Sequence, residues 1–212
     1  LADILKKHEQ VYILTDDIYE KLVYDGNVFH TIASVCPELK STTLTMNGLS
    51  KSHCMTGWRV GYAAGPLNII NAMNKVQSQN VSSTCSISMA ASVEALNGDQ
   101  SFIISNNESF VRRRNLVVKH LNETPGLNCR TPEGAFYVFP SCQGILGKTS
   151  PSGKIISTDS DFMDYLLEEV GVAGVQGSAF GLNGYFRISY ATSDSILEDA
   201  CQRIKTACSK LT

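Results

Sequence analysis

The sequence has no surplus of charge of either sign and no long hydrophobic run. Its 18 Lys and Arg residues are matched by 20 Asp and Glu residues, which gives a formal net charge of -2. A nearly neutral chain has no general attraction to nucleic acid or to an anionic membrane surface. No apolar stretch approaches the roughly 20 residues that a membrane-spanning helix needs, and the first residues lack the pattern of a signal peptide. We therefore expect a globular cytoplasmic protein that binds neither nucleic acid nor membrane.

The sequence also lacks any CxxC pair and any cluster of cysteine with its four histidines that has metal-ligand spacing. An odd, scattered set of thiols is typical of free cysteines in a reducing compartment and argues against a disulfide framework. We therefore predict no metal site. Cys54 is the one thiol close to the candidate site described below, and we interpret it as a small packing residue. The seven cysteines are Cys36, Cys54, Cys85, Cys129, Cys142, Cys201 and Cys208.

The first part of the chain has the pattern of an α/β sheet. With 212 residues, of which 43% are hydrophobic, the chain can form one large domain or two small ones. Short apolar or β-rich runs predict strands at residues 11–15, 42–46 and 59–64, and residues 2–10 resemble the end of a helix. Ligands of open α/β sheets bind beyond the carboxyl ends of the strands. Asp16 and Lys51 follow two of these strands, so we expect a site there.

Beyond Pro66 the pattern is helical. We predict helices over residues 67–79, 83–96 and 101–122, the second of them well packed because it is rich in small residues. The Arg112–Arg114 run is interpreted as a solvated helix surface. After the Pro125–Gly126 turn we predict a small α+β unit. Its expected strands cover residues 135–139 and 186–190, its helices 159–170 and 195–207, and an exposed loop 140–158.

The segment from Asn47 to Gly61 has the strongest chemical pattern. Lys51 follows a β-rich run, and Arg59 lies eight residues later in a glycine-containing stretch. A lysine amine can form an imine with an aldehyde, and a guanidinium can bind a phosphate through two parallel hydrogen bonds. This pair therefore suits a cofactor that carries both an aldehyde and a phosphate.

The segment closely resembles the lysine motif of class I (fold type I) pyridoxal-phosphate-dependent aminotransferases, whose usual form is S-K-x-x-x-x-x-G-x-R-x-G. Residues 18–26 and 95–102 resemble most the bacterial aspartate aminotransferases of the aspartate/prephenate subgroup. The resemblance implies that Lys51 forms a Schiff base with pyridoxal 5'-phosphate and later moves the substrate's α-proton, while Arg59 and Ser50 bind the phosphate. This chain has Gly48 where the family often has a serine or threonine, which leaves the identity of any hydroxyl ligand open.

The resemblance assigns four further residues. Asp16 and Tyr19 have the family's D-x-x-Y spacing, which implies a carboxylate at the pyridine nitrogen and a phenol at the ring oxygen. Asp17 is the competing carboxylate, and the spacing to Tyr19 favours Asp16. Arg187 resembles the arginine that binds the substrate's α-carboxylate, and Phe136, in the Pro-Glu-Gly-Ala-Phe-Tyr sequence, is expected to border the substrate.

The fold implied is the C-terminal part of a fold type I transferase. Residues 1–115 would be the C-terminal portion of the large mixed-sheet α/β domain, ending in a long connecting helix, and residues 116–212 the small α+β domain. Family members are about twice this length, so we expect the N-terminal half to precede Leu1. The implied activity is transamination between an L-amino acid, aspartate or glutamate, and a 2-oxo acid, in a homodimer. Two alternatives stay open: a pyridoxal-phosphate-dependent β-lyase or other carbon–sulfur lyase, and a catalytically silent fragment that only folds or dimerises.

Overall fold

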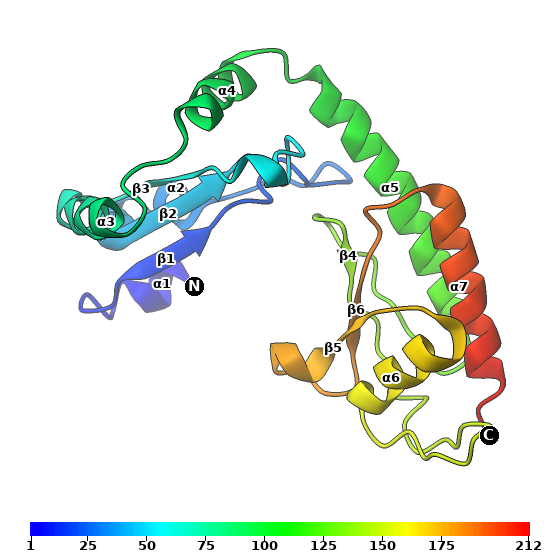
Figure 1. Cartoon of the computed structure of the whole chain (residues 1–212). Helices are drawn as coiled ribbons and strands as arrows, with labels where there is room; N and C mark the ends of the chain where they lie inside the picture. Colours follow the sequence, from blue (N-terminus) through cyan, green and yellow to red (C-terminus); the bar gives the residue numbers. More distant parts are fainter. The chain divides into compact units, whose positions relative to one another are not determined.

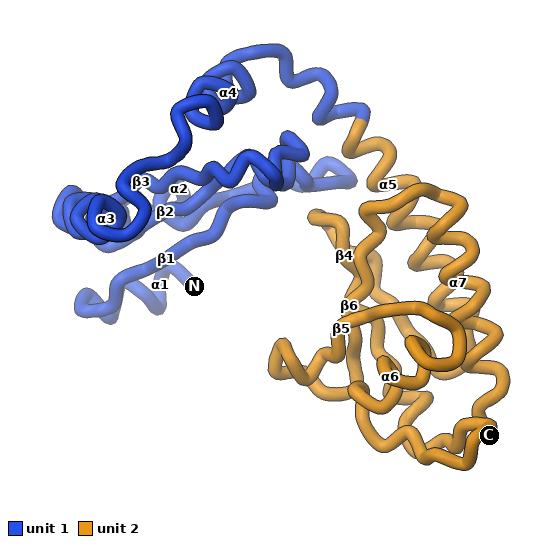
Figure 2. Tube along the Cα trace, in the orientation of Figure 1, with its two compact units in different colours: residues 1–105 blue, residues 106–212 orange.

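The computed structural model describes all 212 residues, and the chain divides into two compact units, Leu1–Ser105 and Asn106–Thr212 (Figure 2). This division falls inside the long helix α5 (Ser101–Asn122), as does the domain boundary after residue 115 that the sequence suggests. No helix of the chain is both long enough and apolar enough to cross a membrane.

The first unit contains a three-stranded sheet of order β1-β2-β3 (Figure 1). Its strands are β1 (Ile13–Asp16), β2 (Thr43–Gly48) and β3 (Gly61–Ala64). β1 and β2 are parallel, with Asp16 opposite Met46, whereas β3 returns antiparallel to β2, with Gly48 opposite Gly61. The parallel pair requires a long connection, which includes the short helix α2 (Ile32–Val35) and the 3₁₀ helix η1 (Pro37–Thr42). All three strands expected from the sequence are therefore present.

Much of the apolar surface of the helices in the first unit is exposed. Besides α2, they are α1 (Ala2–Leu5), α3 (Leu67–Asn80) and α4 (Ser86–Asn97), with the 3₁₀ helix η2 (Thr56–Trp58) between β2 and β3. No residue of α3 is buried, and in α4 only Ser88 and Ser92 are. The expectation that α4 is well packed is therefore wrong for this chain. Helix α1 is also shorter than the residues 2–10 that the sequence suggests.

The second unit packs helices against a small sheet of order β4-β6-β5 (Figure 1). The strands are β4 (Tyr137–Val138), β5 (Val175–Gln176) and β6 (Phe186–Ser189), and both pairings are antiparallel. The helices are α6 (Asp159–Val170) and α7 (Asp194–Ser209), with the 3₁₀ helix η3 (Gly177–Phe180) directly after β5. Phe162, Phe186 and Tyr190 are fully buried at the centre of one hydrophobic core, to which α5, α6 and α7 all contribute.

Side-chain caps explain where α6 and α7 begin. Thr158 accepts a hydrogen bond from the Asp161 backbone N–H, and the Asp161 carboxylate accepts one in return from the Thr158 N–H, which forms a capping box. Ser193 caps α7 by a single bond, in which its hydroxyl oxygen accepts the Ile196 N–H at 3.4 Å. Helix α6 ends at Gly171, whose φ of +67° is the left-handed conformation that glycine tolerates best.

Three interpretations of the sequence are wrong. Residues 140–158 are not an exposed loop, because Cys142, Ile145 and Ile156 are fully buried. Arg114 is not solvated, since it is only 3% exposed and donates a 3.0 Å hydrogen bond to the Pro132 carbonyl. All seven cysteines are free, but Cys54 is exposed with φ of +54° and is not a packing residue.

Candidate active site

Asp16 is placed at the carboxyl end of β1 and faces a hollow. It is the last residue of the strand, and one of its carboxylate oxygens accepts the Ile18 N–H at 3.4 Å. The hollow has a volume of about 410 Å³ and lies between the strand ends and helix α3. Its lining includes Asp16, Met46, Asn47, Tyr62 and Asn74. The neighbouring Asp17 is buried and does not line this hollow, and its N–H continues the sheet by bonding to the Met46 carbonyl at 2.8 Å. Of the two acids, Asp16 is the one available to a ligand here.

Lys51 and Arg59 lie in one closed loop, residues 49–60, between β2 and β3. The loop is fastened internally by two hydrogen bonds: the Thr56 hydroxyl donates to the Ser50 carbonyl at 3.0 Å, and the Arg59 guanidinium donates to the Thr56 carbonyl at 2.9 Å. Lys51 is half-buried and Arg59 is exposed, with φ of +53°. Because β2 and β3 are paired at Gly48 and Gly61, both ends of the loop start from the same place on the sheet. The amine and the guanidinium are thus held within a single short segment.

A histidine that the sequence did not single out fixes the residues after Lys51. The Nδ1 atom of His53 is 2.8 Å from the hydroxyl of Ser52, and its Nε2 is 3.1 Å from the Oε1 of Gln100. The amide nitrogen of Gln100 donates to the carbonyls of Ala95 and Gly98 at the end of α4. The Gln100 oxygen can therefore only accept, so the Nε2 of His53 is the donor in this contact. Since 47 residues separate His53 from Gln100, no local pattern indicates this pair.

The other predicted cofactor residues also lie at this end of the sheet. Tyr19 is half-buried in the turn that follows β1, three residues after Asp16. Ser50 is half-buried and directly precedes Lys51, and its carbonyl is occupied by Thr56. The first unit therefore carries all five residues that the sequence assigned to the cofactor.

Arg187 lies in the second unit, on β6, opposite Val175 of β5. Its guanidinium carbon is 4.6 Å from the ring centre of Tyr137 and 4.7 Å from that of Phe180. Arg187 is half-buried and forms no salt bridge with any Asp or Glu of the chain. A planar cation held by two rings and left without an anionic partner is well suited to bind a carboxylate from a ligand.

Phe136 packs on the core side of this region. Its ring stacks on Phe110 of α5, with ring centres 5.6 Å apart, and it packs against the buried core of the second unit. The ring of Tyr137, the next residue, contacts Arg187. The sequence analysis named Phe136 but did not identify Tyr137 or Phe180.

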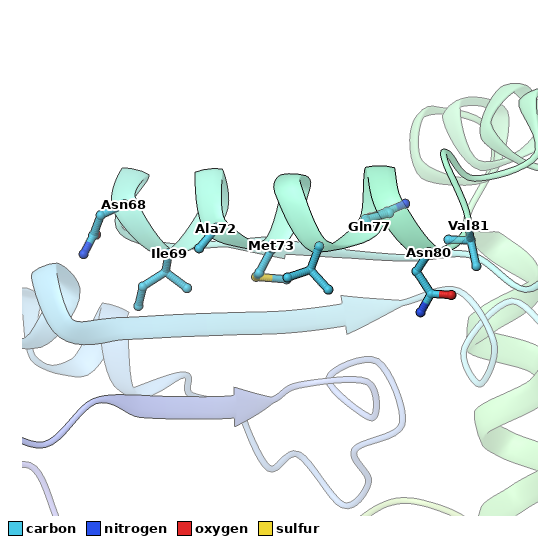
Figure 3. A pocket seen from close by; sticks show the side chains of 8 residues that line it. Asn68, Ile69, Ala72, Met73, Gln77, Asn80 and Val81 are labelled. Atoms are coloured by element: carbon cyan, nitrogen blue, oxygen red, sulfur yellow. The ribbon is translucent and has the colours of Figure 1, made fainter.

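Another hollow lies along α3 and contains none of the predicted site residues (Figure 3). It has a volume of about 720 Å³. Its lining comprises Asn68, Ile69, Ala72, Met73, Val76, Gln77, Asn80 and Val81. The apolar stripe that the sequence indicated on this helix is therefore part of the open surface. The chain has no group of three His, Cys, Asp or Glu residues arranged to hold a metal ion.

The chain is similar to known proteins over almost its whole length. A family model described as "Aminotransferase class I and II" matches residues 1–204. A probable aspartate/prephenate aminotransferase of Rhizobium leguminosarum bv. phaseoli is 57% identical over 208 residues, which cover 98% of this chain and 52% of that protein. An aspartate aminotransferase of Rhizobium meliloti (strain 1021) is 57% identical over 211 residues, covering 100% of this chain and 52% of the relative.

Solved structures give the same result. The crystal structure of the aspartate aminotransferase from Rhizobium meliloti matches with a TM-score of 0.97 at 57% identity, covering 99% of this chain and 52% of that one. The aspartate aminotransferase from Thermus thermophilus with maleate matches with a TM-score of 0.85 at 37% identity, covering 98% and 50%. The chain spans about half the length of the relatives it matches. The expected fold class, part of a fold type I transferase, is confirmed, and the chain belongs to the class I and II aminotransferase family.

Proposed function

We propose that the full-length protein catalyses pyridoxal-phosphate-dependent transamination between an L-amino acid, aspartate or glutamate, and a 2-oxo acid. One observation carries the proposal. In a chain of this family, a carboxylate and a lysine follow two neighbouring parallel strands, Asp16 at the end of β1 and Lys51 in the loop after β2. Both therefore lie at the edge where α/β sheets bind ligands.

The donor set of the first unit fits the cofactor's functional groups. A primary amine (Lys51) suits the aldehyde, a carboxylate (Asp16) the pyridine nitrogen, a guanidinium (Arg59) the phosphate and a phenol (Tyr19) the ring oxygen. Ser50 adds a hydroxyl beside the lysine. When bound, the cofactor supplies an electron sink that stabilises negative charge at the substrate's α-carbon.

Each of these residues has a separate task in this proposal. The Asp16 carboxylate would accept a hydrogen bond from the ring N–H and so keep that nitrogen protonated. Arg59 binds the phosphate and adds positive charge near Lys51. The Lys51 Nζ would hold the cofactor's aldehyde in the resting enzyme, and as a free amine it would take the proton from the substrate's α-carbon.

Arg187 is the proposed anchor for the α-carboxylate, which amino acids and 2-oxo acids share. Its lack of an ion pair and its position between Tyr137 and Phe180 support this role. Phe136 and Tyr137 are the aromatic residues that we propose border the substrate. A bidentate arginine–carboxylate pair fixes orientation as well as adding affinity.

The names of the relatives support aspartate as one amino donor, since they are aspartate and aspartate/prephenate aminotransferases. A carbon–sulfur lyase could use the same lysine, aspartate and arginines. Release of pyruvate and ammonia from a cysteine conjugate, without amino transfer from aspartate to a 2-oxo acid, would identify the lyase instead.

We further propose a homodimer located in the cytoplasm. Seven free cysteines without a disulfide support a reducing compartment. The exposed apolar side chains of α4, Ile87, Met89, Val93 and Leu96, support coverage of this surface by further protein. Light scattering of the full-length protein would measure the subunit number directly.

The decisive experiment replaces Lys51 by alanine in the full-length protein. Lys51→Ala should abolish amino transfer, because it removes the nucleophile and the proton carrier together. Borohydride treatment of the wild type should fix the cofactor on the peptide that contains Lys51, as measured by mass spectrometry. Lys75→Ala, on helix α3, is the matched control and should keep both activity and labelling. Retained turnover in Lys51→Ala would refute the assignment.

A further inference from the structure

We propose that Asp159 is a positioning residue for Arg187. It fastens the segment 178–184, so that the ring of Phe180 stays against the guanidinium. The proposal rests on the proposed function, in which Arg187 binds the α-carboxylate of the substrate. All the residues involved lie in the second unit.

Asp159 is a buried carboxylate that accepts a hydrogen bond from the backbone of the turn after β5. It is the first residue of α6 and only 3% exposed. Its Oδ2 accepts the backbone N–H of Ser178 at 2.7 Å. Burial by itself would raise the pKa of Asp159, but hydrogen bonds, chiefly those from Ser178, leave that pKa below its usual value. The group is therefore an anion at neutral pH, and its hydrogen bond holds the start of the segment from Ser178 to Gly184.

This segment contains Phe180 but does not bury it. Phe180 is 50% exposed, so packing alone does not determine where its ring lies. The ring meets Phe139 edge-on, with centres 5.8 Å apart, and lies 4.7 Å from the guanidinium carbon of Arg187. The turn around it is closed by hydrogen bonds, including that from the Gly177 N–H to the Tyr185 carbonyl at 2.7 Å. The position of Phe180 therefore depends on how this backbone segment is held.

Two aromatic rings confine the guanidinium of Arg187 and so hold it in one orientation. The first ring is that of Tyr137. Tyr137 belongs to β4, which is paired directly with β6, so the sheet itself fixes the position of this ring. The second ring is that of Phe180, which lies in the turn that is bonded to Asp159. An arginine side chain loses much rotational freedom when it binds a carboxylate in a fixed plane, and two rings that already confine it reduce that loss. A buried charge on α6 is thus coupled to the binding of an anion at β6.

Loss of this anchor should weaken the binding of substrate more than the chemical step. Asp159→Asn removes the negative charge and replaces one carboxylate oxygen by an N–H donor beside the Ser178 N–H. We expect roughly a fivefold rise in KM for both the amino donor and the 2-oxo acid, with kcat changed less than about twofold. The affinity for the cofactor should stay unchanged, because its proposed ligands lie in the first unit.

The test compares variants of the full-length protein loaded with cofactor. Asp159→Asn and Phe180→Leu are the test variants, and Asp161→Asn is the matched control. Asp161 lies in the same first turn of α6 and bonds to Ser157 and Thr158, but not to the segment 178–184. KM and kcat are measured for both substrates, and calorimetry gives the Kd of maleate, a dicarboxylate that cannot react. Urea unfolding shows how much stability each variant loses.

The proposal expects Asp159→Asn and Phe180→Leu to raise both KM values and the Kd of maleate several-fold, while Asp161→Asn loses stability without these changes. If Asp159→Asn does not fold, Phe180→Leu decides, since its half-exposed side chain is not needed for the core. Unchanged KM and Kd in the test variants, with a large rise in Arg187→Ala, would overturn the positioning role and leave the proposed function intact. An unchanged KM in Arg187→Ala would overturn the carboxylate role of Arg187 and this inference with it.

Discussion

Gly177→Ala gives a sharp test of how the turn after β5 is built. A Cβ atom added at Gly177 would lie 2.7 Å from the carbonyl oxygen of Tyr185 and closer still to that of Leu182. Ordinary van der Waals contact begins at 3.4 Å, so the Tyr185 carbonyl would have to retreat by about 0.7 Å. Both obstacles are backbone atoms that cannot rotate away. We expect the free energy of unfolding to fall by about 1–3 kcal/mol, as for other overpacked sites.

Gly181→Ala, in the same turn, separates steric clash from backbone strain. Gly181 has φ of +78° but no heavy atom within 4 Å of an added Cβ. Its substitution should cost only the left-handed conformation, about 1 kcal/mol. Urea unfolding of both variants, followed by circular dichroism, measures the two values. The reasoning fails if Gly177→Ala is as stable as the wild type, or is no less stable than Gly181→Ala.

Asp16→Asn in the full-length protein should lower kcat by roughly 100-fold or more with a smaller loss of cofactor affinity, because a neutral amide cannot hold the ring nitrogen protonated; an unchanged kcat would contradict the assignment. Asp194 accepts hydrogen bonds from two arginines of α5, which lower its pKa to about 2. Its stabilising effect is therefore complete above the pKa of an unfolded aspartate, about 4, and is lost as the pH falls toward 2. Urea midpoints should drop less between pH 7 and pH 3 in Asp194→Asn than in the wild type. Hydrogen bonds from backbone N–H groups at the start of α4 lower the pKa of the exposed Cys85, whereas burial raises that of Cys208 to about 12. Iodoacetamide at neutral pH should therefore label Cys85 well before Cys208, and the reverse order by mass spectrometry would show this environment to be wrong.

The parts of the fold that the sequence predicts well are those fixed by neighbouring residues. The predicted long helix, residues 101–122, has the same bounds as α5, and helix 159–170 the same bounds as α6. Strand ends were also located, which placed Asp16 and Lys51 at one edge of the sheet. Each of these predictions depends on a hydrophobic period or a motif that is continuous along the chain. The roles of these site residues in catalysis stay predictions.

What the sequence did not predict depends on residues far apart in the chain. Gln100 fixes His53 from 47 residues away, and Asp159 holds Ser178 from 19 residues away. The burial of Arg114 depends on the Pro132 carbonyl, 18 residues away. A hydrophobic period likewise shows which face of α3 is apolar, but not what covers that face. Such facts need the tertiary structure, because no local preference of the residues encodes them.

The antiparallel return of β3 explains why a fixed spacing between Lys51 and Arg59 can specify a site. If the two residues lay on separate elements, their distance would depend on how those elements pack. Here both belong to one loop whose ends are paired at Gly48 and Gly61 and whose interior is closed by hydrogen bonds to Ser50 and Thr56. The number of residues in the loop therefore determines how the amine and the guanidinium are arranged. Asp16 is then brought to the same edge of the sheet by the parallel pairing of β1 with β2.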